Sequence, residues 1–311
     1  MRNDPAFRAL PRTVAITGAT GLIGTALVQR LRARGDSVRR FVRSTRDPQP
    51  GDIVWDPARG TLDPRTLDGV DALVNLAGAP IAVRWSARRK REIRESRVRA
   101  TDLIASAVAV LDAKPAVVLS GSAVGYYGDR GDELLDERSG SGNDFLAAVV
   151  RDWEEAARPM AVEGVRVVLL RTGIVLSAAG GALAKLLPPF RLGLGGPIGS
   201  GRQWMSWISL RDHVRATEFA LDTPSLAGPV NLVAPEPVTS ADFAHTLGRV
   251  LSRPAVMPIP AFVLELAFGE MARATLLAGQ RLAPTALLDA GFAFHSATLE
   301  HALRAALDGP P

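Results

Sequence analysis

Three glycines at a fixed spacing, Gly18, Gly21 and Gly24, separate an apolar run from an arginine-bearing segment near the start of the 311-residue chain. The first glycine permits a tight turn after a strand, the second lets a diphosphate approach the backbone, and the third lets the next helix lie close to the sheet. A helix start also offers unpaired N–H groups to phosphates. The alternative is a glycine-rich turn without a ligand, but the position between a predicted strand and a predicted helix favours a dinucleotide site. Its predicted contacts are Gly18, Thr20, Gly21, Leu22, Ile23 and Gly24.

The end of the second predicted strand distinguishes NAD from NADP. An acidic residue there binds the ribose 2′-hydroxyl, whereas an arginine accommodates a 2′-phosphate. The segment VRRFVRST contains no acid and offers Arg40, Arg43 and Ser44. Side-chain alternation along a strand makes Arg43 the best placed and Arg40 the second. We therefore predict NADP(H), the alternative being that these arginines are simply exposed.

Two more strand ends fit the same cofactor. VWDP closes the third predicted strand, where Asp56 would meet the adenine edge, and NLAGAPI closes the fourth, where Asn75, Ala77 and Gly78 would line the cleft. Both lie at carboxyl ends of strands, which is where open α/β sheets bind ligands.

A separate cluster of aromatic and basic residues suits a substrate. Trp204 and Trp207 are three residues apart and follow Arg202, so they could stack on a flat ring while the arginine binds an anion. Arg84 and Trp85 would form the opposite wall. The alternative is that the tryptophan pair fills the gap between two lobes.

The elements that must position these residues alternate between strand and helix. Apolar β-branched runs are predicted as strands at 13–18, 37–43, 52–56, 71–78, 116–123 and 165–176, with helices between several of them. This order predicts an α/β fold, a Rossmann-type doubly wound parallel sheet with a smaller C-terminal substrate lobe. The NADP(H)-binding domain is expected at 12–176, with a strand returning near 228–234, and the lobe at 177–307, where a helix opens at Thr239 or Ser240.

Composition and charge limit the classes of molecule that we expect this protein to bind. The net charge is +5. Residues 84–99 carry eight basic and two acidic residues, a net charge of +6, so the rest of the chain sums to −1. We interpret it as a solvated helix face, or as a face on which one or two arginines meet a phosphate or the substrate. We expect a small-molecule substrate, no nucleic acid and no membrane, and leave the oligomeric state open. The absence of cysteine and of a signal peptide favours a soluble cytoplasmic protein, and the histidines show no metal-ligand spacing.

The motifs TGATGLIG, NLAG, SGSAVGYYG, RTGIVL and PFRLGLGGPIGSGRQWMSWI together resemble the extended short-chain dehydrogenase/reductase superfamily. Within it, the chain is similar to the atypical, sugar-nucleotide-epimerase-like branch, and GQRLAPTALLDAGFAF resembles the small C-terminal domain of that branch. The resemblance spans 13–307 and implies an NADP(H)-binding Rossmann domain.

One departure from that superfamily concerns catalysis. Its members use a Ser or Thr with a Tyr-x-x-x-Lys pair, in which lysine lowers the pKa of tyrosine. Here the two tyrosines are Tyr126 and Tyr127, and no lysine lies between Lys114 and Lys185. Ser122 matches the family's Ser/Thr, and either tyrosine is a candidate proton donor, the alternative being that both only pack or bind.

The resulting hypothesis is an NADP(H)-dependent oxidoreductase or epimerase-like enzyme acting on a small carbonyl, hydroxyl or nucleotide-sugar-like substrate. Ser122 would hold the substrate oxygen. The alternative, favoured by the missing dyad, is a non-catalytic NADP(H)-binding protein that senses redox state or regulates a partner.

Overall fold

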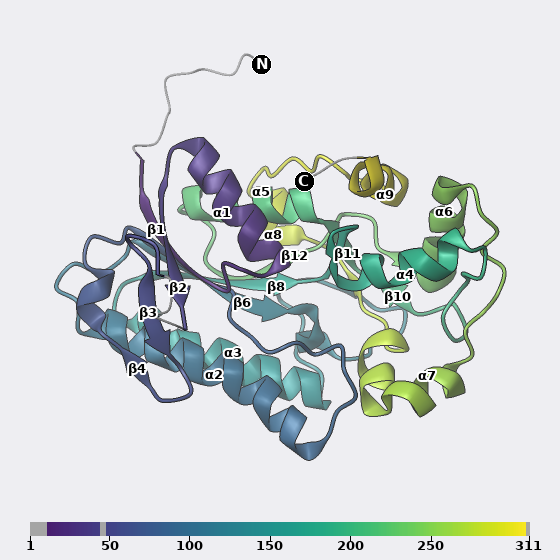
Figure 1. Cartoon of the computed structure of the whole chain (residues 1–311), viewed down its shortest axis with the longest axis horizontal. Helices are drawn as coiled ribbons and strands as arrows, with labels where there is room; N and C mark the ends of the chain where they lie inside the picture. Colours follow the sequence, from purple (N-terminus) through teal and green to yellow (C-terminus); the bar gives the residue numbers. More distant parts are fainter. Residues whose placement is uncertain (1–10, 44–47, 309–311) are drawn as a thin grey trace, which may run out of the picture.

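A mostly parallel sheet runs through the centre of the molecule (Figure 1). The computed structural model describes residues 11–43 and 48–308. Within these residues the sheet has the order β12-β8-β6-β5-β1-β2-β3-β4, and every neighbouring pair is parallel except β3 with β4. The predicted doubly wound parallel sheet is therefore confirmed. Its strands are β1 (Thr13–Thr17), β2 (Ser37–Val42), β3 (Ile53–Asp56), β4 (Thr61–Leu62), β5 (Ala72–Asn75), β6 (Val117–Ala123), β8 (Arg166–Thr172) and β12 (Gly228–Leu232).

Helices cover both faces of this sheet. In Figure 1, α1 (Leu22–Arg34) and α5 (Leu210–Asp222) lie on one face, and α2 (Ala87–Ala109) and α3 (Phe145–Val162) lie on the other. Each pair contributes buried apolar residues to its own core cluster, such as Leu27 and Val214 on the first face and Ile104 and Met160 on the second. Burial on both sides explains the continuous apolar character of the inner strands.

The sixth predicted strand is two strands. The sequence predicted one strand over 165–176, but the chain leaves the sheet at Gly173, and β9 (Ile174–Ser177) pairs instead with β11 (Trp207–Ser209). A Cβ at Gly173 would lie 2.5 Å from the carbonyl oxygen of Ser206. The glycine thus permits the close backbone crossing at which β9 diverges.

The C-terminal part adds a lobe at one end of the sheet (right side of Figure 1). Its core contains Trp207, Phe243 and Leu247. Thr239, one of the two residues predicted to open a helix here, is the N-cap of α6 (Ser240–Leu251) and forms a capping box with Asp242. β12 returns to the main sheet beside β8.

The remaining elements are β7 (Leu134–Leu135), α4 (Gly181–Arg191), β10 (Trp204–Met205), β13 (Val238–Thr239), α6 (Ser240–Leu251), α7 (Ala261–Phe268), β14 (Arg281–Leu282), α8 (Thr285–Asp289), α9 (Leu299–Asp308), 3-10 turns at Pro64–Leu67 and Val124–Tyr127, and a π-helical turn at Ala272–Leu276.

The order of the sheet reverses at β1. From β1 the chain builds β2 and β3 on one side, and then crosses to place β5 on the other side. Loops at the carboxyl ends of β1 and β5 diverge at such a point and leave a crevice for a ligand. No helix in the described part of the chain has both the length and the apolar character needed to cross a bilayer.

Candidate functional site

The glycine loop connects β1 to α1 at this edge of the sheet. Gly18 has φ of +64°, and a Cβ there would lie 2.8 Å from the carbonyl oxygen of Leu76, just beyond β5. The amide of Gly21 donates to the carbonyl of Gly18 at 3.0 Å and closes the turn. Only glycine adopts this backbone easily, so the turn out of β1 depends on it.

Gly24 and Gly21 serve different purposes. A Cβ at Gly24 would lie 2.1 Å from the oxygen of Gly18 and 2.8 Å from the Cα of Ala19, so this glycine lets α1 lie against the loop that precedes it. A Cβ at Gly21 would meet only the oxygen of Gly18, at 3.3 Å. Gly21 has an ordinary extended backbone, with φ of −78°, and is exposed. The fold itself therefore gives only a weak reason for glycine at 21, whereas a ligand approaching the backbone gives a strong one.

The first turn of α1 has free donors. Gly21 is the N-cap residue and supplies no side-chain cap, and the amides of Leu22, Ile23 and Gly24 find no acceptor among the described residues. Thr20 is exposed beside them, and the side chain of Leu22 reaches the turn before α4 at Gly180 and Gly181. These amides and the helix dipole suit an anion.

Asn75 differs from its predicted role. It was expected to line the cleft, but it is 1% exposed, and its side chain accepts from Thr17 Oγ1 at 2.7 Å and donates to Thr101 Oγ1 at 2.9 Å. The side-chain amide therefore joins β5 to β1 and to α2. Ala77 is partly buried against the core, whereas Gly78 is exposed after β5.

The two arginines near the end of β2 are not equivalent. Arg40 forms a bidentate ion pair with Asp52, with nitrogen–oxygen distances of 3.0 and 2.7 Å. Burial alone would raise the pKa of Asp52, but hydrogen bonds from Arg40 and the amide of Gln49 hold it below its ordinary value. Arg43 is exposed one residue beyond β2, and Ser44 lies outside the described residues. Arg43 is therefore better placed than Arg40 for a 2′-phosphate.

Asp56 stabilises a turn. Its carboxylate accepts from the amides of Ala58 and Arg59 at 3.0 and 3.3 Å, between β3 and β4. These two hydrogen bonds give the carboxylate a local role in the turn, and its contact with an adenine edge stays a prediction.

The three candidate catalytic residues are brought together by an ion pair that the sequence analysis missed. Ser122 donates to Glu154 at 2.6 Å, and Glu154 binds Arg171 with two contacts of 2.8 Å. Arg171 donates to the phenolic oxygen of Tyr127 at 3.0 Å and lies 3.5 Å from the ring centroid of Tyr126. Glu154 lies on α3, Arg171 at the end of β8, and the tyrosines on the turn after β6.

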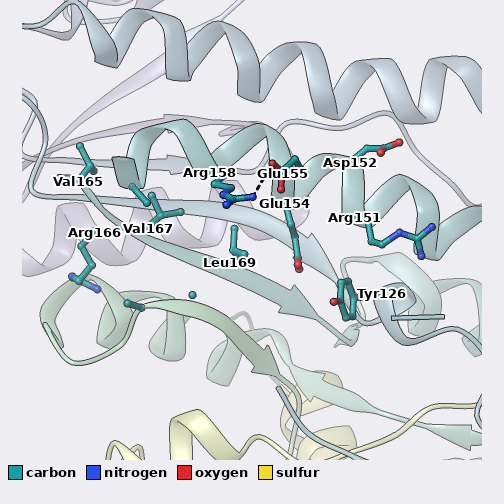
Figure 2. Close-up of a pocket in the computed structure, with 13 residues that line it drawn as sticks. Tyr126, Arg151, Asp152, Glu154, Glu155, Arg158, Val165, Arg166, Val167 and Leu169 are labelled. Atoms are coloured by element: carbon teal, nitrogen blue, oxygen red, sulfur yellow. Dashed lines mark hydrogen bonds and ion pairs between the residues drawn. The ribbon is translucent and has the colours of Figure 1, made fainter. Parts of the chain in front are cut away.

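The two tyrosines have different environments. Tyr127 is fully buried and donates to Asn231 at 2.7 Å, and burial raises its pKa to about 12 although Arg171 opposes the shift. A group so enclosed cannot reach a substrate. Tyr126 is half-buried and lines a groove of about 730 Å³ between α3 and β8, where Arg151 and Leu169 also contribute (Figure 2). This groove does not include the glycine loop.

Apolar residues occupy the usual places of the Tyr/Lys pair. The beginning of α3 carries Phe145, and Leu146 and Val150 behind it are buried. Lys90 of α2 lies 4.4 Å from the ring centroid of Phe145, but it is paired with Glu270 at 2.7 Å.

The predicted substrate residues do not form one wall. Arg84 donates to the carbonyls of Leu266 and Ala267 at the end of α7, and Trp85 packs edge-on against Phe145. Arg202 is exposed, and its side chain has no polar partner among the described residues.

The paired tryptophans are separated by the fold. Trp204 is half-buried, donates to Asp132 at 2.7 Å and stacks under Arg281. Trp207 is 0% exposed in the core of the lobe and donates to the carbonyl of Glu236, so it packs as the alternative interpretation expects, and its substrate contact stays a prediction. A spacing of three in an extended segment points two side chains to opposite faces, and that signal was available in the sequence.

Arg97 is another residue that the sequence analysis did not single out. It lies on α2, and its guanidinium lies against Gly78 after β5, with Cζ 3.0 Å from where a Cβ would be. It was available only as one of eight basic residues in 84–99. The described residues contain no group of three or more His, Cys, Asp or Glu side chains that could hold a metal.

Comparison with known proteins gives consistent matches. The model of the NAD dependent epimerase/dehydratase family matches residues 14–232, and a domain of unknown function, DUF1731, matches 259–306. The epimerase family protein Mb2239 of Mycobacterium bovis is 49% identical over 298 residues, covering 96% of this chain and 98% of the relative. A crystal structure of human epimerase family protein SDR39U1 (isoform 2) with NADPH matches with a TM-score of 0.87 and 37% identity, covering 96% of this chain and 100% of that one. The UDP-glucose 4-epimerase of Thermus thermophilus, with NAD, shares the fold at a TM-score of 0.75 and 18% identity, over 95% of this chain and 98% of that one.

Proposed function

The chain belongs to the NAD-dependent epimerase/dehydratase family, and from that premise we propose that it binds NADP(H) and transfers hydride to or from a small carbonyl or hydroxyl substrate. The predicted resemblance to the atypical, epimerase-like branch with a small C-terminal domain is confirmed. NADPH is the molecule bound in the human relative. Bound nicotinamide would supply the hydride donor or acceptor.

The glycine loop carries this proposal. Its helix amides at Leu22, Ile23 and Gly24 have no acceptor in the described part of the chain, and a Cβ at Gly21 would meet a single protein atom, the oxygen of Gly18 at 3.3 Å. Together they make a cradle for a diphosphate at the point where the sheet order reverses. Arg43, exposed after β2, would bind the 2′-phosphate that distinguishes NADP from NAD.

The proton in the reaction needs a donor. Tyr127 is fully buried, so Tyr126 is the tyrosine left to supply it, with its ring held against Arg171. Ser122 is 4% exposed and donates its one O–H to Glu154, so to orient the substrate oxygen it would turn that O–H from Glu154 toward the substrate. In carbonyl reduction, hydride would go to the carbon and the phenolic proton to the oxygen, and water would then reprotonate the tyrosine.

The hydrogen bond between Ser122 and Glu154, together with the apolar residues of α3, favours a second function. Because Ser122 is engaged by Glu154 and apolar side chains replace the Tyr/Lys pair on α3, the chain could bind NADP(H) without turnover and report redox state to a partner. Oxidation of NADPH with a panel of small carbonyl compounds separates the two functions. Turnover lost in both Ser122→Ala and Tyr126→Phe supports the enzyme, and NADPH binding without oxidation of any compound supports the sensor.

The cradle is tested by Gly21→Ala. The added methyl meets one protein atom at 3.3 Å, so we expect an unfolding midpoint close to that of the unaltered chain, but an NADPH affinity lower by about tenfold or more, which is about 1.4 kcal/mol. Gly140→Ala is the matched control, since a Cβ there meets nothing within 4 Å. Equal NADPH affinity in the two variants would remove the glycine loop as the diphosphate site.

A further inference from the structure

Exposed apolar side chains gather in one part of the C-terminal lobe. Among the described residues, thirteen large apolar side chains are exposed, and seven of them lie within 192–194 and 256–266. We call these seven the apolar patch: Leu192, Leu194, Val256, Met257, Phe262, Val263 and Leu266. Exposed apolar side chains usually stand singly, whereas a contiguous group of them marks an interaction site.

The two segments of the apolar patch lie side by side. The amide of Met257 donates to the carbonyl of Gly195 at 3.1 Å, which holds the chain before α7 against the turn after α4. Phe262 and Leu266 are four residues apart on α7 and share one face, while Leu264 is buried on another. In Figure 1, α7 lies at the outer edge of the lobe. The patch is therefore one continuous surface.

The side chains of the apolar patch project from the molecule. Phe262 is 71% exposed, Leu266 77% and Leu192 74%. Side chains that line a groove for a peptide are partly covered by its walls, and these three are not. Seven residues are also far fewer than the roughly 20–30 that each partner contributes to a stable dimer. The patch instead suits a layer that takes in protruding apolar side chains, as the boundary of a bilayer does.

The arginines at the two ends of the apolar patch form no ion pair among the described residues. Arg253 donates from Nε to the carbonyl of Arg191 at 3.0 Å, so these two lie together at one end, directly before Leu192. Arg84 lies at the other end, where its Nη1 donates to the carbonyl of Leu266 at 2.6 Å. All three are exposed. The patch is thus flanked by positive charge that the described residues do not neutralise.

The acid on α7 does not change this balance. Glu265 is the acidic residue of that helix, and it is paired with Arg273 at 2.9 Å. The surroundings of the apolar patch therefore carry a net positive charge, which complements anionic headgroups. A second copy of the chain would bring the same unpaired arginines to the contact.

We propose that the apolar patch binds the surface of a membrane that contains anionic lipids. Phe262 and Leu266 enter the boundary between headgroups and acyl chains, and Arg84, Arg191 and Arg253 contact the headgroups. Apolar insertion and attraction to anionic lipids together hold a peripheral protein on a bilayer. Such contact requires no spanning segment, so it revises the prediction of no membrane partner, which depended on the lack of one.

Sedimentation of the full chain with vesicles tests the proposal. We expect binding to vesicles of phosphatidylglycerol mixed with phosphatidylcholine, and about tenfold weaker binding to phosphatidylcholine alone. Phe262→Ser combined with Leu266→Ser should weaken binding to the anionic vesicles by about tenfold or more. Val110→Ser combined with Val162→Ser is the matched control, because these exposed valines lie at the ends of α2 and α3, outside the patch.

A pair of charge variants tests the arginines. Arg191→Gln combined with Arg253→Gln should weaken binding to the anionic vesicles by about fivefold or more and reduce its dependence on salt. Arg59→Gln combined with Arg158→Gln removes the same charge from side chains that are 85% and 72% exposed elsewhere, and should change binding by less than about twofold.

Fluorescence of a tryptophan in the apolar patch distinguishes insertion from loose electrostatic contact. Lipids with brominated acyl chains should quench Phe262→Trp, but should quench Val162→Trp no more than the unaltered chain. This variant keeps an aromatic side chain at 262, so it reports even if the serine variant fails to fold.

Three results would each overturn the proposal. The first is that the unaltered chain does not sediment with the anionic vesicles. The second is that the serine variants inside and outside the apolar patch bind these vesicles equally well. The third is a dimer of the unaltered chain in solution that Phe262→Ser combined with Leu266→Ser dissociates, because a second copy would then cover the patch. None of these measurements depends on NADPH.

Discussion

At the scale of single residues, burial separates side chains that hold the fold from those that can meet a ligand. Tyr127, Arg171 and Asn231 are each 3% exposed or less, and Tyr127 is hydrogen-bonded to both of the others, whereas Arg43 and Gly21 are exposed. Removing one partner of the buried Glu154–Arg171 pair leaves an uncompensated charge, which typically costs about 3–5 kcal/mol. Loss of activity in such variants would therefore report unfolding and not chemistry.

The cofactor preference depends on Arg43. Arg43→Ala should weaken NADPH by about tenfold to a hundredfold, the value of a charged hydrogen bond of roughly 1.5–3 kcal/mol, and leave NADH unchanged. Titration calorimetry with both nucleotides measures this. Arg59→Ala is the control, because its side chain is 85% exposed near the same edge of the sheet. An equal loss for both nucleotides would assign Arg43 to something other than the 2′-phosphate.

His213 makes stability depend on pH. It is fully buried on α5, its Nε2 lies 3.1 Å from Thr172 Oγ1, its Nδ1 has no partner among the described residues, and burial lowers its pKa to about 4 from an ordinary 6.5. The unfolded chain binds this proton below about pH 6.5 and the folded chain only near pH 4. The free energy of unfolding should therefore fall as pH drops through that window, by about 3 kcal/mol in all.

Urea unfolding at several pH values tests this slope. His213→Gln should flatten the dependence between pH 6.5 and 4, while the exposed histidine variant His245→Gln should keep it. Parallel curves for the unaltered chain and His213→Gln would show that this imidazole does not contribute.

At the scale of elements, close backbone approaches position the crevice. Gly24 lets α1 start against the loop leaving β1, and Gly173 lets β9 leave the sheet toward the lobe. Glycine spacing indicated the first approach because the motif is local. The second was missed because the apolar run 165–176 continues through Gly173, and the neighbour that forces the divergence, Ser206, is 33 residues away in sequence.

Gly24→Ala tests the placement of α1. Alanine normally stabilises a helix interior by about 1 kcal/mol relative to glycine. Here the methyl would lie 2.1 Å from the oxygen of Gly18, so we expect a net loss of about 1–3 kcal/mol in the free energy of unfolding. Chemical denaturation measures this loss, with Gly21→Ala as the comparison, since both changes add one methyl at the start of α1. Stabilisation by Gly24→Ala would mean that α1 starts elsewhere.

At the scale of the whole molecule, the sequence predicted the order of strands and helices along the chain, but not the contacts between side chains that are distant in sequence. Alternation of strands and helices predicted the doubly wound sheet. The glycine spacing predicted the loop after β1, the strand at which the order of the sheet reverses. The pairing of Ser122 with Glu154, the hydrogen bonds that consume Asn75 and the burial of Trp207 depend on tertiary packing that no local spacing encodes. The position of Arg97 against Gly78 is of the same kind, because seven other basic residues lie in 84–99 and no local spacing distinguishes Arg97 from them.

The most direct measurement is calorimetric titration of the unaltered full chain with NADPH and then with NADH. We predict one NADPH per chain, with NADH at least about tenfold weaker, the difference expected from one added phosphate contact. No heat with either nucleotide at concentrations far above those of cells would contradict the account at its centre, and equal affinity for the two would contradict its NADP assignment.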